Sequence, residues 1–523
     1  MNNTEYIAID LGTTNSVVGA IQDDGTEVIV KNLDGETSTP SFIWVKENKG
    51  TDTIDFIVGK KAKELMSEDP EDVLSSYKPS MGTNKIIKIV KRRSFTAKLC
   101  SAAVLQYLKR SAEADLNSIV TKAIITVPAY FDDKQKQETR AAATLAGLEV
   151  IQLVAEPTAA GFYYGKIGKD KVDKNILAYD LGGGTFDVSI LLAQADGDVI
   201  VQRVGGDKHL GGDDVDQALA KRIIEKASED NKELIEKIVN DTSLFERFIR
   251  RAEEAKITLS KAYREGKKQS RTTINIPKNK LTEEFPETIN VSLKEFLDVL
   301  KPFIDRTISI TQDIVNQAGL EIDEVLLIGG STKLPLIREG LIDLLQNPKF
   351  DIEYFDDYLL DPDQSVALGA REILKDYLNN NEISITDAVS LPIGIEMATG
   401  EFKPIIGSGT PLPARGTYDF TNPDDNQRQL TFGIYEGVSK LAKENHQLGE
   451  VAVEIKPSLR GKVKGLIKIL VNREGLITAK VKIEDKILTY KLSGQDKYDG
   501  DEFNNIIQNK ATTKKGNAVK FGK

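Results

Sequence analysis

Two short stretches of the sequence place an aspartate directly before a glycine turn. IAIDLGTTNSVVGAI occupies residues 7–21, and LAYDLGGGTFDVSIL occupies residues 177–191. Aligned, they superpose Asp10 on Asp180 and Gly12 on Gly182, and each reads as a strand, a tight turn and a second strand. One copy alone could equally be a structural hairpin. Two copies indicate a duplicated unit with one purpose.

The residue types at these turns suit a phosphorylated ligand that carries a metal ion. Glycine has no Cβ, so the backbone N–H groups of the turn can approach an anion closely. An aspartate would repel phosphate, but it can hold a hydrated Mg²⁺ beside phosphate. We therefore predict that the two turns face each other across a cleft and grip a nucleoside triphosphate. A third glycine turn, at Gly329, Gly330 and Ser331, is a candidate site for the nucleoside.

Strand and helix patterns alternate around these turns up to about residue 380. KAIITVP (122–128) predicts a buried strand, and residues 132–147 predict a helix that ends at Gly147. Ser292 and Glu295 form a capping-box pattern before a long apolar stripe. Alternation of this kind is typical of an α/β architecture, which we predict for residues 1–380.

The pattern changes after residue 380. The polar segment NNNEISITDAV (379–389) predicts an interdomain linker at 381–389. Between residues 390 and 493, apolar side chains recur at every second position, as at Leu430 and Phe432, which predicts an antiparallel β-sandwich. Residues 494–523 are polar, and the last fourteen contain five lysines and no acidic residue, so we expect a disordered basic tail.

Composition limits the class of protein. A net charge of −10 over 523 residues argues against nucleic-acid binding, which needs clustered Lys and Arg. The single cysteine, Cys100, excludes an intramolecular disulfide and favours a reducing compartment. No apolar run approaches the roughly 18 residues of a membrane span, and the N-terminus lacks a signal-peptide pattern. We expect a soluble, cytoplasmic, monomeric protein that binds neither nucleic acid nor membranes.

With these motifs in hand, the sequence resembles the seventy-kilodalton heat-shock chaperone family, the DnaK-like proteins. The resemblance implies an actin-like ATPase domain of two ribonuclease-H-like lobes, followed by a peptide-binding β-sandwich. LPIGIE, DDNQ, YEG and REGLITAKV, between residues 391 and 481, resemble the sandwich of that family. The motifs that resemble its ATPase domain are, in order, IDLGTTNS, ITVPAYF, EPTAA, DLGGGTFDVS, HLGGDD, IGGSTKLP and PDQSVALGA.

The resemblance also implies roles for individual residues. Asp10 and Asp180 would hold Mg²⁺ through water, and Lys78 would place the attacking water. Glu156 and Thr185 would orient that water and the γ-phosphate. ATP, ADP, Mg²⁺ and K⁺ are the cofactors implied. The residues expected to bind the nucleotide are Gly12, Thr13, Thr14, Asn15, Gly182, Gly183, Gly184, Thr185, Glu253, Lys256, Ser260, Gly329, Gly330, Ser331, Lys333 and Asp363.

Several positions depart from the family pattern. The family's interdomain switch has an arginine at the position of Lys136, and it also includes the positions of Pro128 and Asp387. Lysine cannot form the bidentate hydrogen bonds that an arginine makes to a carboxylate. Gln152 and Ala155 replace an arginine and an asparagine, and ISIT (383–386) replaces a leucine-rich linker. Thirty residues follow Ser493, where the family continues with a helical lid, so we expect no lid. The implied peptide groove consists of Ile395, Met397, Ala398, Phe420, Leu430, Phe432 and Leu476.

The sequence thus favours an ATP-dependent chaperone of unfolded or specific client polypeptides. A dedicated J-domain partner and a nucleotide exchange factor would serve it. Two alternatives remain open at this point. One is an actin-like ATP switch that acts as a scaffold or regulator without general chaperoning. The other is a metabolite kinase on the same frame, although such kinases do not combine VPAYF with an added sandwich.

Overall fold

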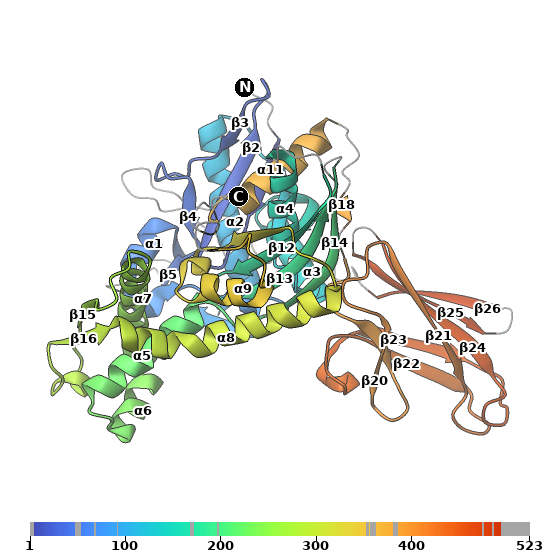
Figure 1. Ribbon diagram of the computed structural model, residues 1–523. Coiled ribbons are helices and arrows are strands. Elements are labelled where there is room, and N and C mark those ends of the chain that lie inside the picture. The colour runs from blue at the N-terminus through green and yellow to red at the C-terminus, as the bar shows by residue number, and fades with distance from the viewer. Residues whose placement is uncertain are drawn as a thin grey trace.

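The computed structural model describes two α/β lobes and a β-sandwich (Figure 1). The described residues are 5–47, 54–66, 69–90, 93–167, 172–195, 198–351, 355, 362–379, 385–386, 388–472, 475–483 and 486–492. No helix in these ranges is both long and apolar enough to cross a membrane. The expectations for the tail, the lid and Asp387 fall outside the described residues.

The first lobe is built on a mixed sheet whose strands run in the order β11–β10–β1–β2–β3, with β4 paired to β2. These strands are β1 (Tyr6–Asp10), β2 (Asn15–Ile21), β3 (Glu27–Ile29), β4 (Ser38–Pro40), β10 (Lys122–Val127) and β11 (Glu149–Ala155). Helices α2 (Ala97–Leu116) and α3 (Asp133–Leu145) pack against it. Beside it lie β5 (Ile43–Glu47), β6 (Ile54–Val58), α1 (Lys60–Leu65), β7 (Val73–Leu74), β8 (Ile86–Val90) and β9 (Arg93–Thr96).

The second lobe repeats this plan in the order β17–β12–β13–β14–β18. Its strands are β12 (Lys174–Leu181), β13 (Phe186–Ala193), β14 (Val199–Asp207), β17 (Glu324–Ile328) and β18 (Ile385–Thr386). Around them lie α5 (Gly212–Ala227), α6 (Lys232–Asn240), α7 (Thr242–Arg264), the hairpin β15 (Arg271–Asn275) and β16 (Thr288–Ser292), α8 (Leu293–Ala318) and α9 (Ile337–Leu345). The capping box predicted at Ser292 and Glu295 begins α8, and Gly319 ends it in a left-handed conformation.

The strand register confirms the internal duplication. In the first hairpin Asp10 lies opposite Val17, and in the second Asp180 lies opposite Asp187, so both turns close at the same spacing. Each hairpin is extended by a parallel strand, β10 beside β1 and β17 beside β12. Helices α4 (Glu156–Ile167) and α11 (Ser365–Leu378) contribute to one apolar core that includes residues from both sheets. The two lobes therefore share an interior.

The sandwich consists of two four-stranded antiparallel sheets, β20–β19–β22–β23 and β21–β24–β25–β26. Its strands are β19 (Ile393–Glu396), β20 (Phe402–Ile406), β21 (Ala414–Thr421), β22 (Gln429–Glu436), β23 (His446–Glu454), β24 (Lys464–Val471), β25 (Ile477–Ile483) and β26 (Lys486–Lys491). The alternation seen in the sequence arises because one face of each sheet lines a common core, while the other side chains point outward. The predicted α/β and sandwich regions are both present.

The linker contributes a strand that its sequence did not suggest. Ile385 and Thr386 form β18, which pairs in parallel with Val199 and Ile200 at the edge of the second lobe. In Figure 1 this strand lies beside β14, next to the point at which the chain passes into the sandwich. The segment between the domains is thus docked on the second lobe through backbone pairing.

Candidate nucleotide site

The two Asp-Gly turns contact each other across the lobes. A Cβ at Gly183 would lie 2.2 Å from Thr14 Oγ1, and a Cβ at Gly184 would lie 3.3 Å from Thr13 Cγ2. No side chain could fit at Gly183 unless Thr14 moved. Glycine is therefore needed here to bring the backbone of the second turn against the threonines of the first.

The third glycine turn, which ends at Ser331, meets the second turn through Gly212, the first residue of α5. The Gly212 backbone N–H donates to the Gly182 carbonyl at 3.0 Å. A Cβ at Gly212 would lie 2.5 Å from Ser331 Oγ and 3.2 Å from Lys256 Nζ. Three segments that are distant in sequence therefore meet at one place, as a nucleoside diphosphate site requires.

The remaining residues expected at the adenosine lie around this junction. Lys256 on α7 forms a 2.5 Å ion pair with buried Asp216. Glu253, one turn earlier, lies 3.4 Å from Lys63 of the first lobe and so spans the cleft. Ser260 is buried further along the same helix. Lys333 pairs with Asp363 at 2.6 Å, and a Cβ at Gly330 would lie 3.3 Å from the Asp363 carboxylate.

Beneath the two turns lies a group of buried and partly buried carboxylates. Asp10 accepts a hydrogen bond from Thr126 Oγ1 at 3.0 Å, and Asp187 accepts one from the Tyr130 backbone N–H at 2.8 Å. Asp180 Oδ2 has no hydrogen-bond partner. Burial, and after it the charge of Glu156, raises the pKa of Asp10 and of Asp187 to about 7 and that of Asp180 well above its usual value.

Lys78 brings a positive charge into this group. Its side chain is almost fully buried, and its Nζ lies 2.7 Å from Glu156 Oε1 and donates to the Leu11 carbonyl. A short 3₁₀ helix, Lys78–Ser80, carries it, and α4 begins at Glu156. The contact to Leu11, the residue after Asp10, places the ammonium group at the first Asp-Gly turn. Lys78 can there hold a water or a phosphate oxygen.

The donor set fits a hydrated divalent cation. Four carboxylates face a lysine, and the Asp180 oxygen without a partner is the kind of group that an ion satisfies. Within the described ranges, no three His, Cys, Asp or Glu side chains could ligate one metal ion directly. A cation here would keep most of its water ligands, as Mg²⁺ does beside phosphates.

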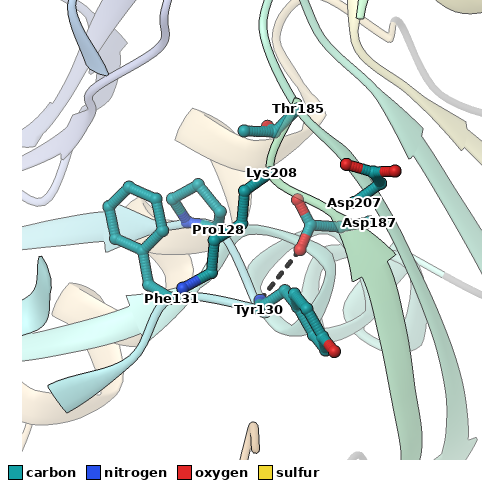
Figure 2. Close-up of a pocket in the computed structure, with 7 residues that line it drawn as sticks. All are labelled: Pro128, Tyr130, Phe131, Thr185, Asp187, Asp207 and Lys208. Carbon is teal, nitrogen blue, oxygen red and sulfur yellow. Dashed lines mark hydrogen bonds between the residues drawn. The ribbon is translucent and has the colours of Figure 1, made fainter. Parts of the chain in front are cut away.

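A narrow crevice lies next to this group. Figure 2 shows Asp187 at its wall, with the hydrogen bond from the Tyr130 backbone, and Thr185 above it. Asp187 was not among the predicted site residues. A signal existed, because Asp187 lies in the second strand of the hairpin predicted after Asp180, and the observed register places it opposite Asp180. The crevice is lined by Pro128, Tyr130, Phe131, Thr185, Asp187, Asp207 and Lys208.

A second, partly buried carboxylate was also missed. Asp213, in the motif HLGGDD, donates its backbone N–H to the Gly183 carbonyl at 2.7 Å, and its Oδ2 has no partner. Burial raises its pKa to about 6. Its side chain lies 3.2 Å from the position of a Cβ at Gly183. Asp213 therefore belongs to the wall of the phosphate turn.

The predicted groove residues divide into two groups in the sandwich. Ile395 and Leu430 are buried in its core, so an ordinary packing role accounts for both. Phe420 is also buried, and its ring lies 4.5 Å from that of Phe432. Phe432 and Met397 are partly buried, while Ala398 and Leu476 are exposed. An apolar surface accessible to a peptide would thus centre on Phe432.

The interdomain switch positions are partly described. Pro128 lines the crevice beside Asp187. Lys136 donates a 3.0 Å hydrogen bond from Nζ to Ser390 Oγ at the start of the sandwich. Glu156 forms its ion pair with Lys78 and not with Lys136. Gln152 lies in β11 opposite Ile124.

Comparison with known proteins shows the family to which the chain belongs. The family model described as Hsp70 protein matches residues 6–520, which include both lobes and the sandwich. The chain belongs to the Hsp70 family. Its fold is accordingly an actin-like nucleotide-binding domain followed by a β-sandwich substrate domain, and it is a member of an ATP-binding chaperone family.

Three relatives named chaperone protein DnaK cover nearly the whole chain. The one from Mycoplasmoides gallisepticum is 33% identical over 536 aligned positions, which cover 99% of this chain and 85% of the relative. Those from Mycoplasma mobile and Mesomycoplasma hyopneumoniae are each 34% identical and cover 99% of this chain and 83% of their own lengths. The similarity therefore extends to the sandwich.

Proposed function

We propose that this Hsp70-family protein hydrolyses ATP slowly between its two lobes and uses the nucleotide state to control peptide binding in the sandwich. The observation that carries the proposal is the buried Lys78–Glu156 pair beside Asp10, Asp180 and Asp187, beneath two glycine turns in contact. A metabolite kinase does not account for the added sandwich.

The residues of the chain account for most of the chemistry of phosphoryl transfer, in which catalysis is mainly positioning and charge stabilisation. Backbone N–H groups of the two turns would hold the phosphates, and the Thr185 hydroxyl would orient the terminal one. Lys78 and Glu156 would position a water in line with that phosphate and take up its proton at a Glu156 oxygen. Mg²⁺, held by Asp10 and Asp180 through water, would supply charge neutralisation when bound; K⁺ remains a prediction.

The sandwich supports binding of extended apolar segments. A strand edge can pair with a peptide backbone, and an apolar pocket can take an alternate side chain. The Phe420–Phe432 ring pair supports such a pocket, since Phe432 is accessible while Phe420 fixes it from below. Clients and co-chaperones in general follow from the family. A dedicated J-domain partner, an exchange factor, a monomeric state and a cytoplasmic location remain predictions.

A second candidate function is a nucleotide-controlled scaffold or regulator without general chaperoning. It is favoured by Lys136, Gln152 and Ala155, which replace two arginines and an asparagine of the family pattern. These replacements remove one positive charge and the bidentate hydrogen bonding of arginine. Steady-state ATP turnover with and without a short leucine-rich peptide distinguishes the two. A chaperone binds the peptide and shows turnover that depends on it, whereas a scaffold turns ATP over with no response to peptide. Absence of turnover in the presence of Mg²⁺ would contradict the proposed ATPase.

A further inference from the structure

The sandwich reaches the first ATPase lobe through a buried carboxylate. Glu436, the last residue of β22, is 5% exposed. Its Oε2 accepts a 2.9 Å hydrogen bond from the backbone N–H of Asp133, the first residue of α3. The first N–H groups of a helix have no partner within the helix, and they form its positive end. A side chain from another domain thus supplies a partner for the start of α3.

Two further contacts show that this carboxylate is part of a docking face. Lys136, one turn along α3, donates to Ser390 at the start of the sandwich. A Cβ at Gly409 would lie 2.9 Å from the Gln202 carbonyl oxygen on β14, so the 407–410 turn packs closely on the second lobe. Glu436 is therefore buried by the approach of one domain to the other.

The docked face also connects to the nucleotide site. The Tyr130 backbone N–H is bound by Asp187, and the Asp133 backbone N–H is bound by Glu436. The short segment from Tyr130 to Asp133 is thus held at one end by a carboxylate of the ATPase cluster and at the other by a carboxylate of the sandwich. A change in docking must alter the restraint on this segment.

We propose that Glu436 is a proton-dependent latch, so that docking of the sandwich on the ATPase domain takes up a proton at this carboxyl and positions the Tyr130–Asp133 segment. The latch depends on the proposed function only for its effect on ATP turnover. Docking itself can be measured without any turnover. Glu436 acts through Asp133 and Tyr130 and is a positioning residue.

The charged groups around Glu436 decide the sign. Burial dominates and raises its pKa from 4.5 to about 8, with Asp132 and Asp133 acting in the same direction and Lys136 against it. On β19 its pairing partner is the apolar Ile393, and on β23 it is His446. Burial lowers the pKa of His446, which faces Asp132, Lys134 and Lys208. Burial raises the pKa of Asp133 to about 6.

These shifts define a pH window. Between about pH 6.5 and 8 the docked carboxyl of Glu436 keeps a proton that the undocked one has lost, so docking weakens as the pH rises. His446 acts in the opposite direction, but only below its ordinary pKa of 6.5. Asp133 acts in the same direction as Glu436, but only below about pH 6. We expect the ratio of docked to undocked protein to fall roughly tenfold between pH 6.5 and pH 8.

Energy transfer within the full chain tests the latch. Donor and acceptor dyes are attached through Lys61→Cys and Lys480→Cys, both at exposed positions, while Cys100 is buried and does not compete. Glu436→Gln keeps a carbonyl acceptor for the Asp133 N–H but cannot ionise, so we expect it to stay docked across the window. Glu436→Asp shortens the side chain and should weaken docking even at pH 6.5. Glu450→Gln, at an exposed position on the same sheet, is the matched control.

The outcomes separate the latch from its alternatives. Equal pH profiles in wild type and Glu436→Gln would overturn the proposal, as would a profile abolished by His446→Gln alone. A flat profile in Glu436→Gln, with Glu450→Gln like wild type, supports it. If the wild-type chain shows the docking transition but hydrolyses no ATP, the proposed function fails while the latch stands.

Discussion

The ammonium nitrogen of Lys78 lies 2.7 Å from Glu156 Oε1, and both side chains are largely buried between the glycine turns. Lys60 and Glu36 form a pair of similar length, 2.6 Å, but both are about half exposed. The same two residue types therefore form a pair inside the site and a pair on the surface, and the Lys60–Glu36 pair is a natural control for the buried one.

Lys78→Ala should lower ATP turnover by about 10²- to 10³-fold, the usual effect of removing one preorganised stabilising group. Single-turnover hydrolysis of labelled ATP measures this step apart from product release. Lys60→Ala, which breaks the exposed pair, should leave the rate within twofold of wild type. Hydrolysis by Lys78→Ala at the wild-type rate would show that Lys78 does not contribute to catalysis.

Asp187→Asn should stabilise the nucleotide-free protein at pH 8 and leave it unchanged at pH 4. The folded-state pKa of Asp187 is raised from 3.8 to about 7, so its contribution to stability is full below about pH 4 and is lost as the pH rises through 7. Asparagine keeps an oxygen for the Tyr130 N–H. The expected gain at pH 8 is on the order of 2–4 kcal/mol in the free energy of unfolding. Urea denaturation at both pH values measures it, and an equal effect at both would contradict the cause given.

Mg²⁺ with ADP should raise the melting temperature of the wild-type chain, and removal of Mg²⁺ by a chelator should reverse most of that rise. Ligand that binds only the folded state at about 100 times its Kd stabilises by ~2.7 kcal/mol. Asp180→Asn should keep the fold and lose the Mg²⁺-dependent part. Asp419→Asn, an exposed change on the sandwich, should behave as wild type. A chelator-insensitive rise in wild type would remove the case for a metal at Asp180.

Phe432→Asp should weaken binding of a short leucine-rich peptide at least tenfold, because it places a charge in the accessible part of the aromatic pair. Most of the loss should be in the dissociation rate. Val438→Asp is a matched control, since Val438 is 70% exposed and lies outside the ring pair. Fluorescence anisotropy with a labelled peptide measures both rates, and unchanged dissociation in Phe432→Asp would place the peptide elsewhere.

Stimulation of ATP turnover by a generic J-domain should be weak in wild type and larger in Gln152→Arg. Gln152 lacks the charge that the family has at this position, and it lies on β11, which pairs with β10. Thr144→Arg, an equal change in charge on the exposed end of α3, controls for nonspecific attraction. Strong stimulation of the wild-type protein would show that the departures at this face do not matter.

The sequence predicted those parts of the site whose residues are contiguous in a short motif. The Asp-Leu-Gly turns could be found because a strand, a carboxylate and glycines are contiguous at Asp10 and again at Asp180. Asp187 was missed because its partner lies across the hairpin, and Asp213 because its role depends on contact with Gly183.

Elements whose environment is made by a distant segment could not be predicted. β18 is two residues long, too short to show alternation, and its partner β14 lies almost two hundred positions earlier. Glu436 ends an ordinary alternating strand, so its burial depends on where α3 of another domain lies. In the groove, Leu430 has the same apolar alternation whether it faces a peptide or the core, and the structure places it in the core.

The two-residue strand β18 also sets the length of free linker between the second lobe and the sandwich. With Thr386 paired to β14, only two Cα steps, about 7 Å, lead to Ala388, which forms a β-bridge with Pro411 of the sandwich. If that pairing opened, the free chain would run from Leu378 at the end of α11 to Ala388 and reach about 35 Å. The local concentration of the sandwich at its docking face would then fall roughly tenfold, with no change in the face itself. A pair of backbone hydrogen-bonded residues thus acts on every interdomain contact at once, including the one made by Glu436.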